Sequence, residues 1–370
     1  MSDRLRPALV QADFSVGAVE DNLRRILSFH AEAGDADLLV MPAGVLSGYP
    51  PQDLVLRPAF VARAEAALEA LAARVRGSRT AVLVGLPIRG LGHPHNAAVL
   101  LRPDGTREIV ATQELPKEDV FDEVRHFAPG LPSLPVLLEG FRLGVLIRED
   151  LWHPGPAARL ASAGAEVLLA INGSPFEAGK ADRRVSVARA RLRETGLPVA
   201  YLNLCGAQDE IVFDGASFLL GAPSAAPWRA PAFAEAALRV DLVRGPEGLS
   251  FEPLSPSAPA WPDGNASRRL ARVASLRGYV RKNGFREVLL GLSSGIDSAA
   301  VAAMAADALG PEAIRAVYLP SALTLAEAQT VRFKIRLSEI PLLSPVPALS
   351  EALGPAIAAP PRGALARQNL

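Results

Sequence analysis

Short apolar runs alternate with longer amphipathic stretches from residue 5 to about residue 245. A short run of apolar and β-branched residues predicts a buried strand, whereas apolar positions that recur every three or four residues predict a helix. The helices expected on this basis occupy residues 16–34 and 59–77, and each ends near a glycine suited to a helix C-terminus. This alternation is typical of an α/β domain built of packed layers. The expected strands occupy residues 7–12, 37–42, 81–86, 96–101, 143–147, 166–171 and 199–204.

A change of composition then divides the chain. Residues 246–266 are rich in proline and glycine, which sustain neither a helix nor a central strand, so we interpret them as a linker. The linker separates a first domain, residues 1–245, from a second α/β unit, residues 267–370. After residue 320 we expect one or two amphipathic helices and a short apolar run at 340–343. Before it we expect a helix, a strand, a helix and a strand at 267–284, 287–292, 299–310 and 314–320.

Charge and cysteine content narrow the function. The 370 residues include 39 Lys+Arg and 39 Asp+Glu, so no overall field attracts nucleic acid or an anionic membrane. The single cysteine cannot form an intrachain disulfide, which is typical of a cytoplasmic protein. No apolar run approaches the roughly 18 residues that a membrane span needs. We therefore expect a cytoplasmic protein that binds neither nucleic acid nor a membrane.

The sequence LLGLSSGIDSAAVAA places a Ser/Gly loop between an expected strand and an expected helix. Backbone N–H groups of such a loop and the N-terminus of the helix converge on one point, which suits a phosphate group. The alternative is an ordinary strand–turn–helix connection in which a serine or an aspartate caps the helix. The candidate phosphate-binding residues are Ser293, Ser294, Gly295, Ile296, Asp297 and Ser298.

This loop resembles the ATP loop of the N-type ATP pyrophosphatases, a Ser-Gly-Gly-x-Asp-Ser pattern whose members split ATP into AMP and pyrophosphate. Ser294 stands where that pattern has its first glycine, so its side chain is expected to crowd the phosphates. By the same resemblance Asp297 is the candidate ligand for Mg²⁺.

The first domain resembles the nitrilase-type glutaminase domain of bacterial glutamine-dependent NAD⁺ synthetases. In that family an ATP-pyrophosphatase domain follows, as it does here. The resemblance implies an α/β fold: a nitrilase-like α-β-β-α sandwich followed by a partial, Rossmann-like parallel sheet. It rests on LSGYPPQDLVLRPAF (46–60), VFDEVRHFAPG (120–130), REDLW (148–152), INGSPFEAGKADRR (171–184) and AQDEIVFDGASF (207–218).

The family's amidase residues are a glutamate base, an oxyanion-stabilising lysine and a cysteine nucleophile, and all three positions differ here. By the flanking motifs, Ala43 stands at the glutamate, Thr112 at the lysine and Arg148 at the cysteine. Arg148 cannot act as a nucleophile, because its guanidinium stays protonated and has no acceptor. Lys117 would have to enter from a different part of the loop, and the only thiol, Cys205, is expected to be a small buried side chain. We expect that glutamine hydrolysis is lost.

The resemblance implies a carbon–nitrogen ligase that uses ATP and Mg²⁺ to amidate deamido-NAD⁺ to NAD⁺, with ammonia delivered from glutamine. It also implies a homo-oligomer. Against the family pattern, the chain ends at Leu370 before segments expected to complete the second domain, so that domain is expected to be incomplete. Two alternatives stay open: a pseudoenzyme that serves as a binding or scaffold subunit, and the product of a decayed gene.

Overall fold

Residues 3–117, 121–246, 248–293, 295–319 and 335–340 are described in the computed structural model. The chain divides into two compact units between Gly278 and Tyr279, inside helix α5 (Gly264–Lys282). The three apolar core clusters all lie within the first unit. Each unit is described separately below.

The first sheet of the first unit has the strand order β1-β15-β2-β3-β4-β5-β6, and β16 pairs with β15. Neighbours β2, β3 and β4 are parallel, whereas the other pairs are antiparallel. The strands are β1 (Arg4–Leu5), β2 (Pro7–Gln11), β3 (Leu38–Val40), β4 (Ala81–Ile88), β5 (His95–Leu101), β6 (Arg107–Ala111), β15 (Ala236–Gly245) and β16 (Gly248–Pro253).

The second sheet has the order β14-β13-β10-β9-β8-β7, with β8, β9 and β10 parallel. Ile147, the last residue of β8, pairs with Ile171, the last residue of β9, so the two strands end side by side. The strands are β7 (Val136–Leu138), β8 (Phe141–Ile147), β9 (Val167–Ile171), β10 (Val199–Leu202), β13 (Phe218–Leu220) and β14 (Trp228–Arg229). A separate hairpin joins β11 (Cys205–Gln208) to β12 (Ile211–Asp214).

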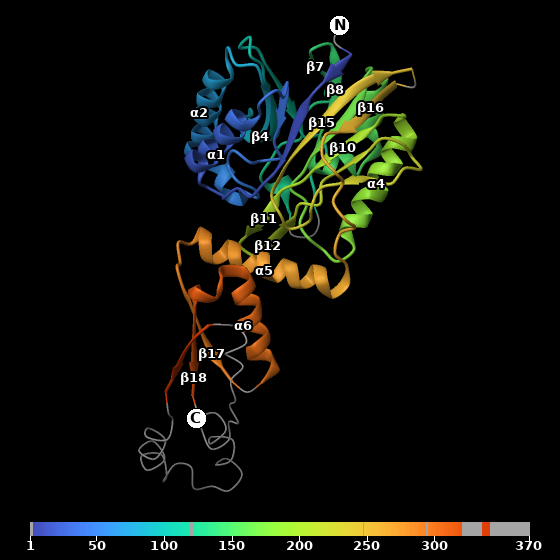
Figure 1. The fold of residues 1–370 in the computed structure, drawn as a ribbon. Coiled ribbons are helices and arrows are strands. Elements are labelled where there is room, and N and C mark those ends of the chain that lie inside the picture. Colours follow the sequence, from blue (N-terminus) through green and yellow to red (C-terminus); the bar gives the residue numbers. More distant parts are fainter. Residues whose placement is uncertain (1–2, 118–120, 247, 294, 320–334, 341–370) are drawn as a thin grey trace. The chain divides into compact units, whose positions relative to one another are not determined.

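Helices cover the outer faces of both sheets, so the first unit has four layers (Figure 1). Helices α1 (Val19–Glu32) and α2 (Pro58–Val75) pack on the first sheet, and α3 (Pro154–Ser162) and α4 (Lys180–Thr195) pack on the second. A third apolar cluster, which includes Leu83 and Val145, fills the space between the sheets. Burying one such leucine or valine contributes about 1.5–3 kcal/mol to stability, so the three clusters together stabilise the layered structure. The expected α-β-β-α sandwich is confirmed.

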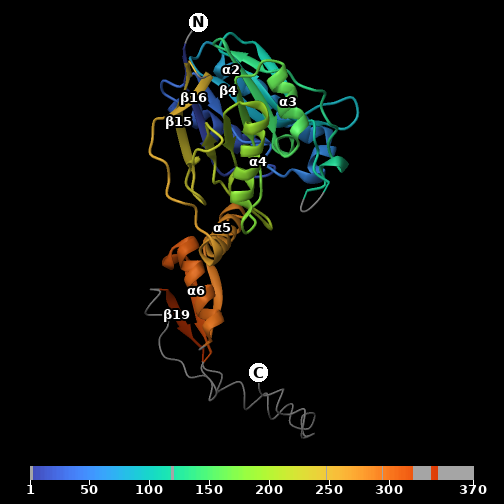
Figure 2. The ribbon, with the colours of Figure 1, turned by 90° about the vertical axis from the view of Figure 1, so that its right-hand side faces the viewer.

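The described strands of the second unit form a parallel sheet in the order β17-β18-β19. They are β17 (Val288–Leu292), β18 (Ile314–Tyr318) and β19 (Arg336–Glu339). Helix α6 (Ile296–Leu309) connects the first two strands and lies against both of them (Figure 2). This strand–loop–helix–strand order confirms the expected parallel α/β arrangement. The helices expected after residue 320 and most of the apolar run at 340–343 lie outside the described residues.

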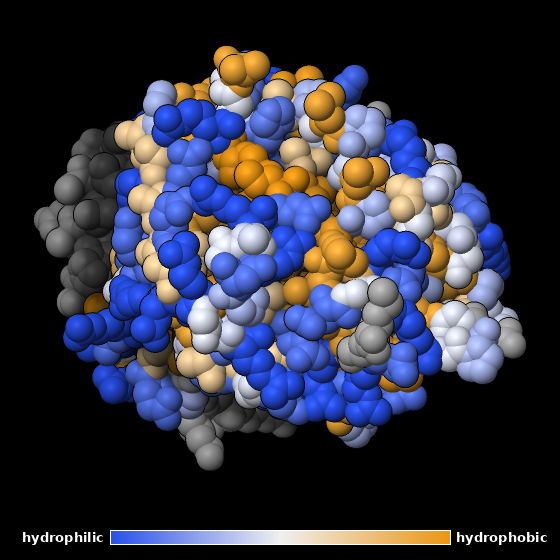
Figure 3. All heavy atoms as spheres, turned by 90° about the horizontal axis from the view of Figure 1, so that it is seen from above, coloured by the Kyte–Doolittle hydropathy of each residue, from blue (hydrophilic) through white to orange (hydrophobic). Residues whose placement is uncertain are grey.

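The structure differs from the sequence expectation in residues 246–266, where strand β16 forms within the expected linker. Among the described strands β16 pairs with β15 alone, so it lies at an edge, where neighbouring proline and glycine are tolerated. Short 3₁₀ helices, η1 (Gln52–Leu56), η2 (Glu123–Arg125), η3 (Arg148–Leu151) and η4 (Pro311–Ala313), also went unpredicted. The surface intersperses apolar and polar residues on the face seen in Figure 3.

Candidate functional site

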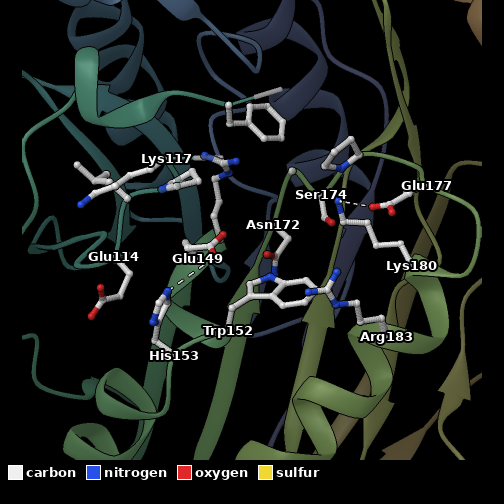
Figure 4. Close-up of a pocket in the computed structure, with 16 residues that line it drawn as sticks. Glu114, Lys117, Glu149, Trp152, His153, Asn172, Ser174, Glu177, Lys180 and Arg183 are labelled. Carbon is white, nitrogen blue, oxygen red and sulfur yellow. Dashed lines mark ion pairs between the residues drawn. The ribbon is translucent and has the colours of Figure 1, made fainter. Parts of the chain in front are cut away.

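A cavity of about 670 Å³ opens where β8 and β9 end. Arg148 follows β8 directly and Asn172 follows β9 directly, so the paired strand ends bring these two residues to the same edge of the sheet. Other walls come from the segment after β6, from the residues after η3 and from the first turns of α4, as Figure 4 shows. The lining residues are Glu114, Leu115, Pro116, Lys117, Phe121, Arg148, Glu149, Trp152, His153, Asn172, Gly173, Ser174, Pro175, Glu177, Lys180 and Arg183.

Arg148 is the buried cation of this cavity, with 6% of its side chain exposed. It forms an ion pair with Glu123, and its guanidinium carbon lies 4.3 Å from the Tyr49 ring centroid and 4.6 Å from that of Phe121. The Tyr49 hydroxyl donates to Glu123 Oε1 at 3.0 Å, and burial raises the pKa of Tyr49 well above its usual value. Two rings and one carboxylate therefore hold the guanidinium rigidly.

The backbone at Arg148 has φ +54°, a left-handed conformation that side-chain-bearing residues rarely adopt. Such a conformation persists only where surrounding structure imposes it, and it clusters at functional sites. The turn from β8 into η3 therefore directs position 148 toward the cavity at a cost in backbone energy.

Thr112 is buried, and it connects the end of β6 to the end of β8 by hydrogen bonds. Its hydroxyl donates to the Ile147 carbonyl at 3.1 Å and contacts Asp150 Oδ1 at 3.3 Å. Asp150 also accepts from the backbone N–H groups of Gln113, Glu114 and Ile147 at 2.8, 2.9 and 3.1 Å. Burial raises the pKa of Asp150 to about 6, against the effect of these donors. Asp150 therefore holds the loop after β6 against the end of β8.

Ala43 is fully buried in the cluster between the two sheets. The chain packs tightly beside it, because a Cβ added at Gly85 would lie 2.8 Å from Ala43 Cα and 2.4 Å from the Gly44 nitrogen. Of Ala43, Thr112 and Arg148, the three positions that the resemblance assigns to the amidase residues, Arg148 is the one that lines the cavity in the described part of the chain.

Lys117 lines the cavity from the far side of Pro116, although its side chain is exposed. Glu149 also lines it and lies 3.8 Å from His153, and burial raises the pKa of Glu149.

Cys205 is 4% exposed at the start of β11 and does not line the cavity. This burial confirms the expectation of a small buried side chain. Burial first, and then the negative charge of Asp13, raises the pKa of the Cys205 thiol to about 12.

Sequence reasoning missed the support of the cavity's second wall. Arg184 is fully buried, pairs with Asp214 at 2.7 Å and donates to the carbonyls of Ser174 and Pro175 at 3.1 and 2.7 Å. At Gly173 an added Cβ would lie 2.7 Å from the Tyr49 ring, so glycine permits the close approach. Gly173, Ser174, Pro175 and Arg184 all lie in segment 171–184, whereas Asp214, the partner of Arg184, does not. The pattern of charges along this segment does not predict which of its arginines is buried.

In the second unit, the candidate phosphate-binding residues begin directly after β17, and the last three, Ile296–Ser298, form the first turn of α6. The Ser293 and Ser298 hydroxyls lie 3.0 Å apart, and the Gly295 N–H donates to Ser293 Oγ at 3.1 Å. Asp297 occupies the first turn of α6, and Ser294 lies outside the described residues. Within the described ranges, no group of three or more His, Cys, Asp or Glu side chains could hold a metal ion.

Comparisons with known proteins agree with this geometry. The carbon–nitrogen hydrolase family model matches residues 6–224, and the NAD synthase model matches residues 270–360. A glutamine-dependent NAD⁺ synthetase from Rhodobacter capsulatus is 44% identical over 333 residues, covering 88% of this chain and 58% of that protein. The structure of such a synthetase from Acinetobacter baumannii superposes with a TM-score of 0.86 at 30% identity, over 97% of this chain and 68% of that one.

The chain belongs to the glutamine-dependent NAD⁺ synthetases. It spans about three fifths of the length of the Rhodobacter synthetase that it matches. An amidase from Nesterenkonia sp. AN1, whose active-site cysteine carries an acetamide group from fluoroacetamide, superposes on the first unit with a TM-score of 0.56 at 25% identity; the match covers 65% of this chain and 90% of that one. None of the helices in the described part of the chain has the length and apolarity to cross a membrane.

Proposed function

We propose that this synthetase-family chain takes part in the ATP-dependent amidation of deamido-NAD⁺ and that its first domain does not hydrolyse glutamine. The observation that carries the proposal is that Arg148, which the motif resemblance assigns to the family's nucleophile, lines the cavity. A guanidinium held by Glu123 and two rings offers no lone pair to an amide carbon. Ammonia for the ligase reaction then comes from solution or from another protein.

The two other altered positions support the same proposal. The Thr112 hydroxyl is hydrogen-bonded to the Ile147 carbonyl and to the Asp150 carboxylate. Thr112 also has no positive charge that could stabilise an oxyanion. Ala43 has no group that could accept a proton, and it is buried between the sheets. Lys117 lines the cavity, but a lysine alone supplies neither a nucleophilic thiolate nor the base that activates one.

For the ligase reaction we propose that Ser293–Ser298 bind the phosphates of ATP. The first N–H groups of α6 have no acceptor within the helix, and this suits phosphate oxygens. The relative from Acinetobacter baumannii, whose structure is a complex with ADP, supports a nucleotide site in this family. Asp297 would share Mg²⁺ with phosphate oxygens and water, because magnesium usually keeps several waters and takes few protein ligands. In this reaction the nicotinate carboxylate would take the adenylyl group of ATP with release of pyrophosphate, and ammonia would then displace AMP to form the amide.

We further propose the domain limits 1–245 and 267–370, with 246–266 as the connection that carries β16. A cytoplasmic location and a homo-oligomeric state remain part of the same proposal. The second candidate function is a pseudoenzyme that binds a ligand or a partner through its first domain. It is favoured by a sandwich whose cores remain filled although the amidase chemistry is absent.

Ammonia release from glutamine by the purified chain tests the proposal. We expect no release above the rate without protein. Release that persists after removal of trace contaminants, and that disappears in Cys205→Ala, would show that the thiol at β11 is the nucleophile and that the proposal is wrong.

A further inference from the structure

Two residues that line the cavity at the ends of β8 and β9 have buried hydrogen-bond donors with no acceptor in the described chain. Asn172 is 1% exposed and lines the cavity, and its Nδ2 has no acceptor among the described residues. Arg148 Nε and Nη1 are likewise buried without a hydrogen-bond partner among the described residues, but Nη1 forms the ion pair with Glu123 and Nε forms none. A buried donor left without an acceptor costs about 1–3 kcal/mol, so two in one cavity indicate a missing acceptor.

The geometry of Arg148 specifies the shape of that acceptor. Glu123 Oε1 occupies the Nη1 side of the guanidinium, and this leaves the edge that contains Nε unpaired. A planar carboxylate matches such an edge with two parallel hydrogen bonds. Because Tyr49 and Phe121 fix the plane of the guanidinium, little side-chain freedom is lost on binding.

The size of the cavity agrees with a small-molecule ligand. Its volume of about 670 Å³ is within the range typical of small-molecule sites. Arg183 lies over the Trp152 ring at 5.1 Å, and Figure 4 shows Asn172, Trp152 and Arg183 facing the same space. The lining includes four cationic residues, Lys117, Arg148, Lys180 and Arg183, and three acidic ones, Glu114, Glu149 and Glu177. Arg148 is already paired with Glu123, and Lys180 lies 3.3 Å from Glu177, so the charges in and around the cavity balance. The acidic residues disfavour a highly charged ligand such as a nucleoside triphosphate.

We propose that this cavity binds a small organic acid, whose carboxylate accepts hydrogen bonds from Arg148 and Asn172. The cavity is then a binding site for acids in place of an amide-hydrolysing one. The proposal goes beyond the loss of glutaminase activity, and it is measured by binding and not by turnover, so either proposal can fail while the other stands.

Calorimetric titration of the full chain with two matched acid and amide pairs tests it: succinate with succinamide, and L-glutamate with L-glutamine. Hydrogen bonds to a charged partner contribute about 1.5–3 kcal/mol, which corresponds to about tenfold or more in affinity. We expect at least one acid to bind saturably and about tenfold more tightly than its amide. Equal affinity within both pairs, or no saturable binding of either acid, overturns the proposal.

Variants connect the binding to the two donors. Asn172→Asp replaces the donor with an acceptor of the same shape, and we expect it to weaken acid binding by about tenfold or more. Asn265→Asp makes the same substitution at an exposed position of α5 and is expected to leave binding unchanged. Arg148→Met with Glu123→Gln removes the buried pair together, and it keeps the test valid if Asn172→Asp does not fold. Unchanged acid binding in a folded variant of either kind contradicts the proposal.

Discussion

Arg148 and Glu123 form an ion pair in which each side chain is 6% exposed. The two residues come from different segments, η3 after β8 and η2 in the loop that follows β6. Tyr49 reinforces the pair through its hydrogen bond to Glu123 and its ring contact with Arg148. The pair therefore joins three segments of the first domain around the cavity.

Removing one partner of this pair should be costly. Glu123→Gln leaves Arg148 as an uncompensated buried cation, and we expect a loss of about 3–5 kcal/mol in the free energy of unfolding. The double variant Arg148→Met with Glu123→Gln should lose less, because no charge remains buried. Urea unfolding measures both. Glu20→Gln, which breaks an exposed pair with Arg63, is the matched control and should have little effect. A Glu123→Gln loss as small as that of the control contradicts this prediction.

Restoring amidase chemistry should require all three positions. We expect Ala43→Glu, Thr112→Lys and Arg148→Cys singly to leave ammonia release at background, since each leaves the catalytic unit incomplete. The single Ala43→Glu should also lower stability, because it places a carboxylate at a fully buried position. The three substitutions together are expected to be necessary for activity, and a single variant with measurable turnover would refute this account.

Cys205 should be unreactive in the folded protein. Its pKa of about 12 leaves very little thiolate at neutral pH, and its side chain is 4% exposed. We expect 5,5′-dithiobis(2-nitrobenzoic acid) to modify no thiol in the native chain at pH 8 and one thiol per chain in urea. Because this is the only cysteine in the sequence, the stoichiometry reports on Cys205 alone. Fast labelling of the native chain is the contrary result.

Asp150 should make stability depend on pH. Its pKa is raised from 3.8 to about 6, so the unfolded chain releases this proton at a lower pH than the folded chain does. The contribution of Asp150 to stability is therefore complete below about pH 4 and is lost as the pH rises through about 6. Urea midpoints at pH 4, 5, 6 and 7, compared between the parent and Asp150→Asn, measure it. We expect the difference between the two proteins to change across this window, and a constant difference contradicts the prediction.

Ser294→Gly should improve the binding of Mg-ATP. Glycine stands at this position in the pattern that the loop resembles, and it removes a side chain expected to crowd the phosphates. Isothermal titration of the full chain compares the variant with its parent. Ser257→Gly, at an exposed position before α5, is a suitable control. Tight binding by the parent, with no gain in Ser294→Gly, would show that the serine is tolerated.

Apolar periodicity predicted the buried strands well, because residues of β4 and β9 are apolar at nearly every position. It missed β16, whose pairing with β15 depends on a distant part of the first domain's sheet and not on its own sequence. The motifs singled out Arg148, which lines the cavity. They also singled out Ala43, which is buried between the sheets and does not line it. The unpaired amide of Asn172 could not be predicted, because a missing hydrogen bond is visible only once its neighbours are placed.

Because the backbone at Arg148 is left-handed, the direction in which position 148 points is set by the backbone and not by the type of side chain that it carries. The turn after β8 would direct a thiol, an alcohol or an imidazole into the same cavity, because the direction is imposed by the chain and its paired strands. Engineering of the first domain at this position therefore requires a paired exchange: a new group at position 148 also calls for a neutral residue at position 123, because Arg148 is the buried partner of the Glu123 charge.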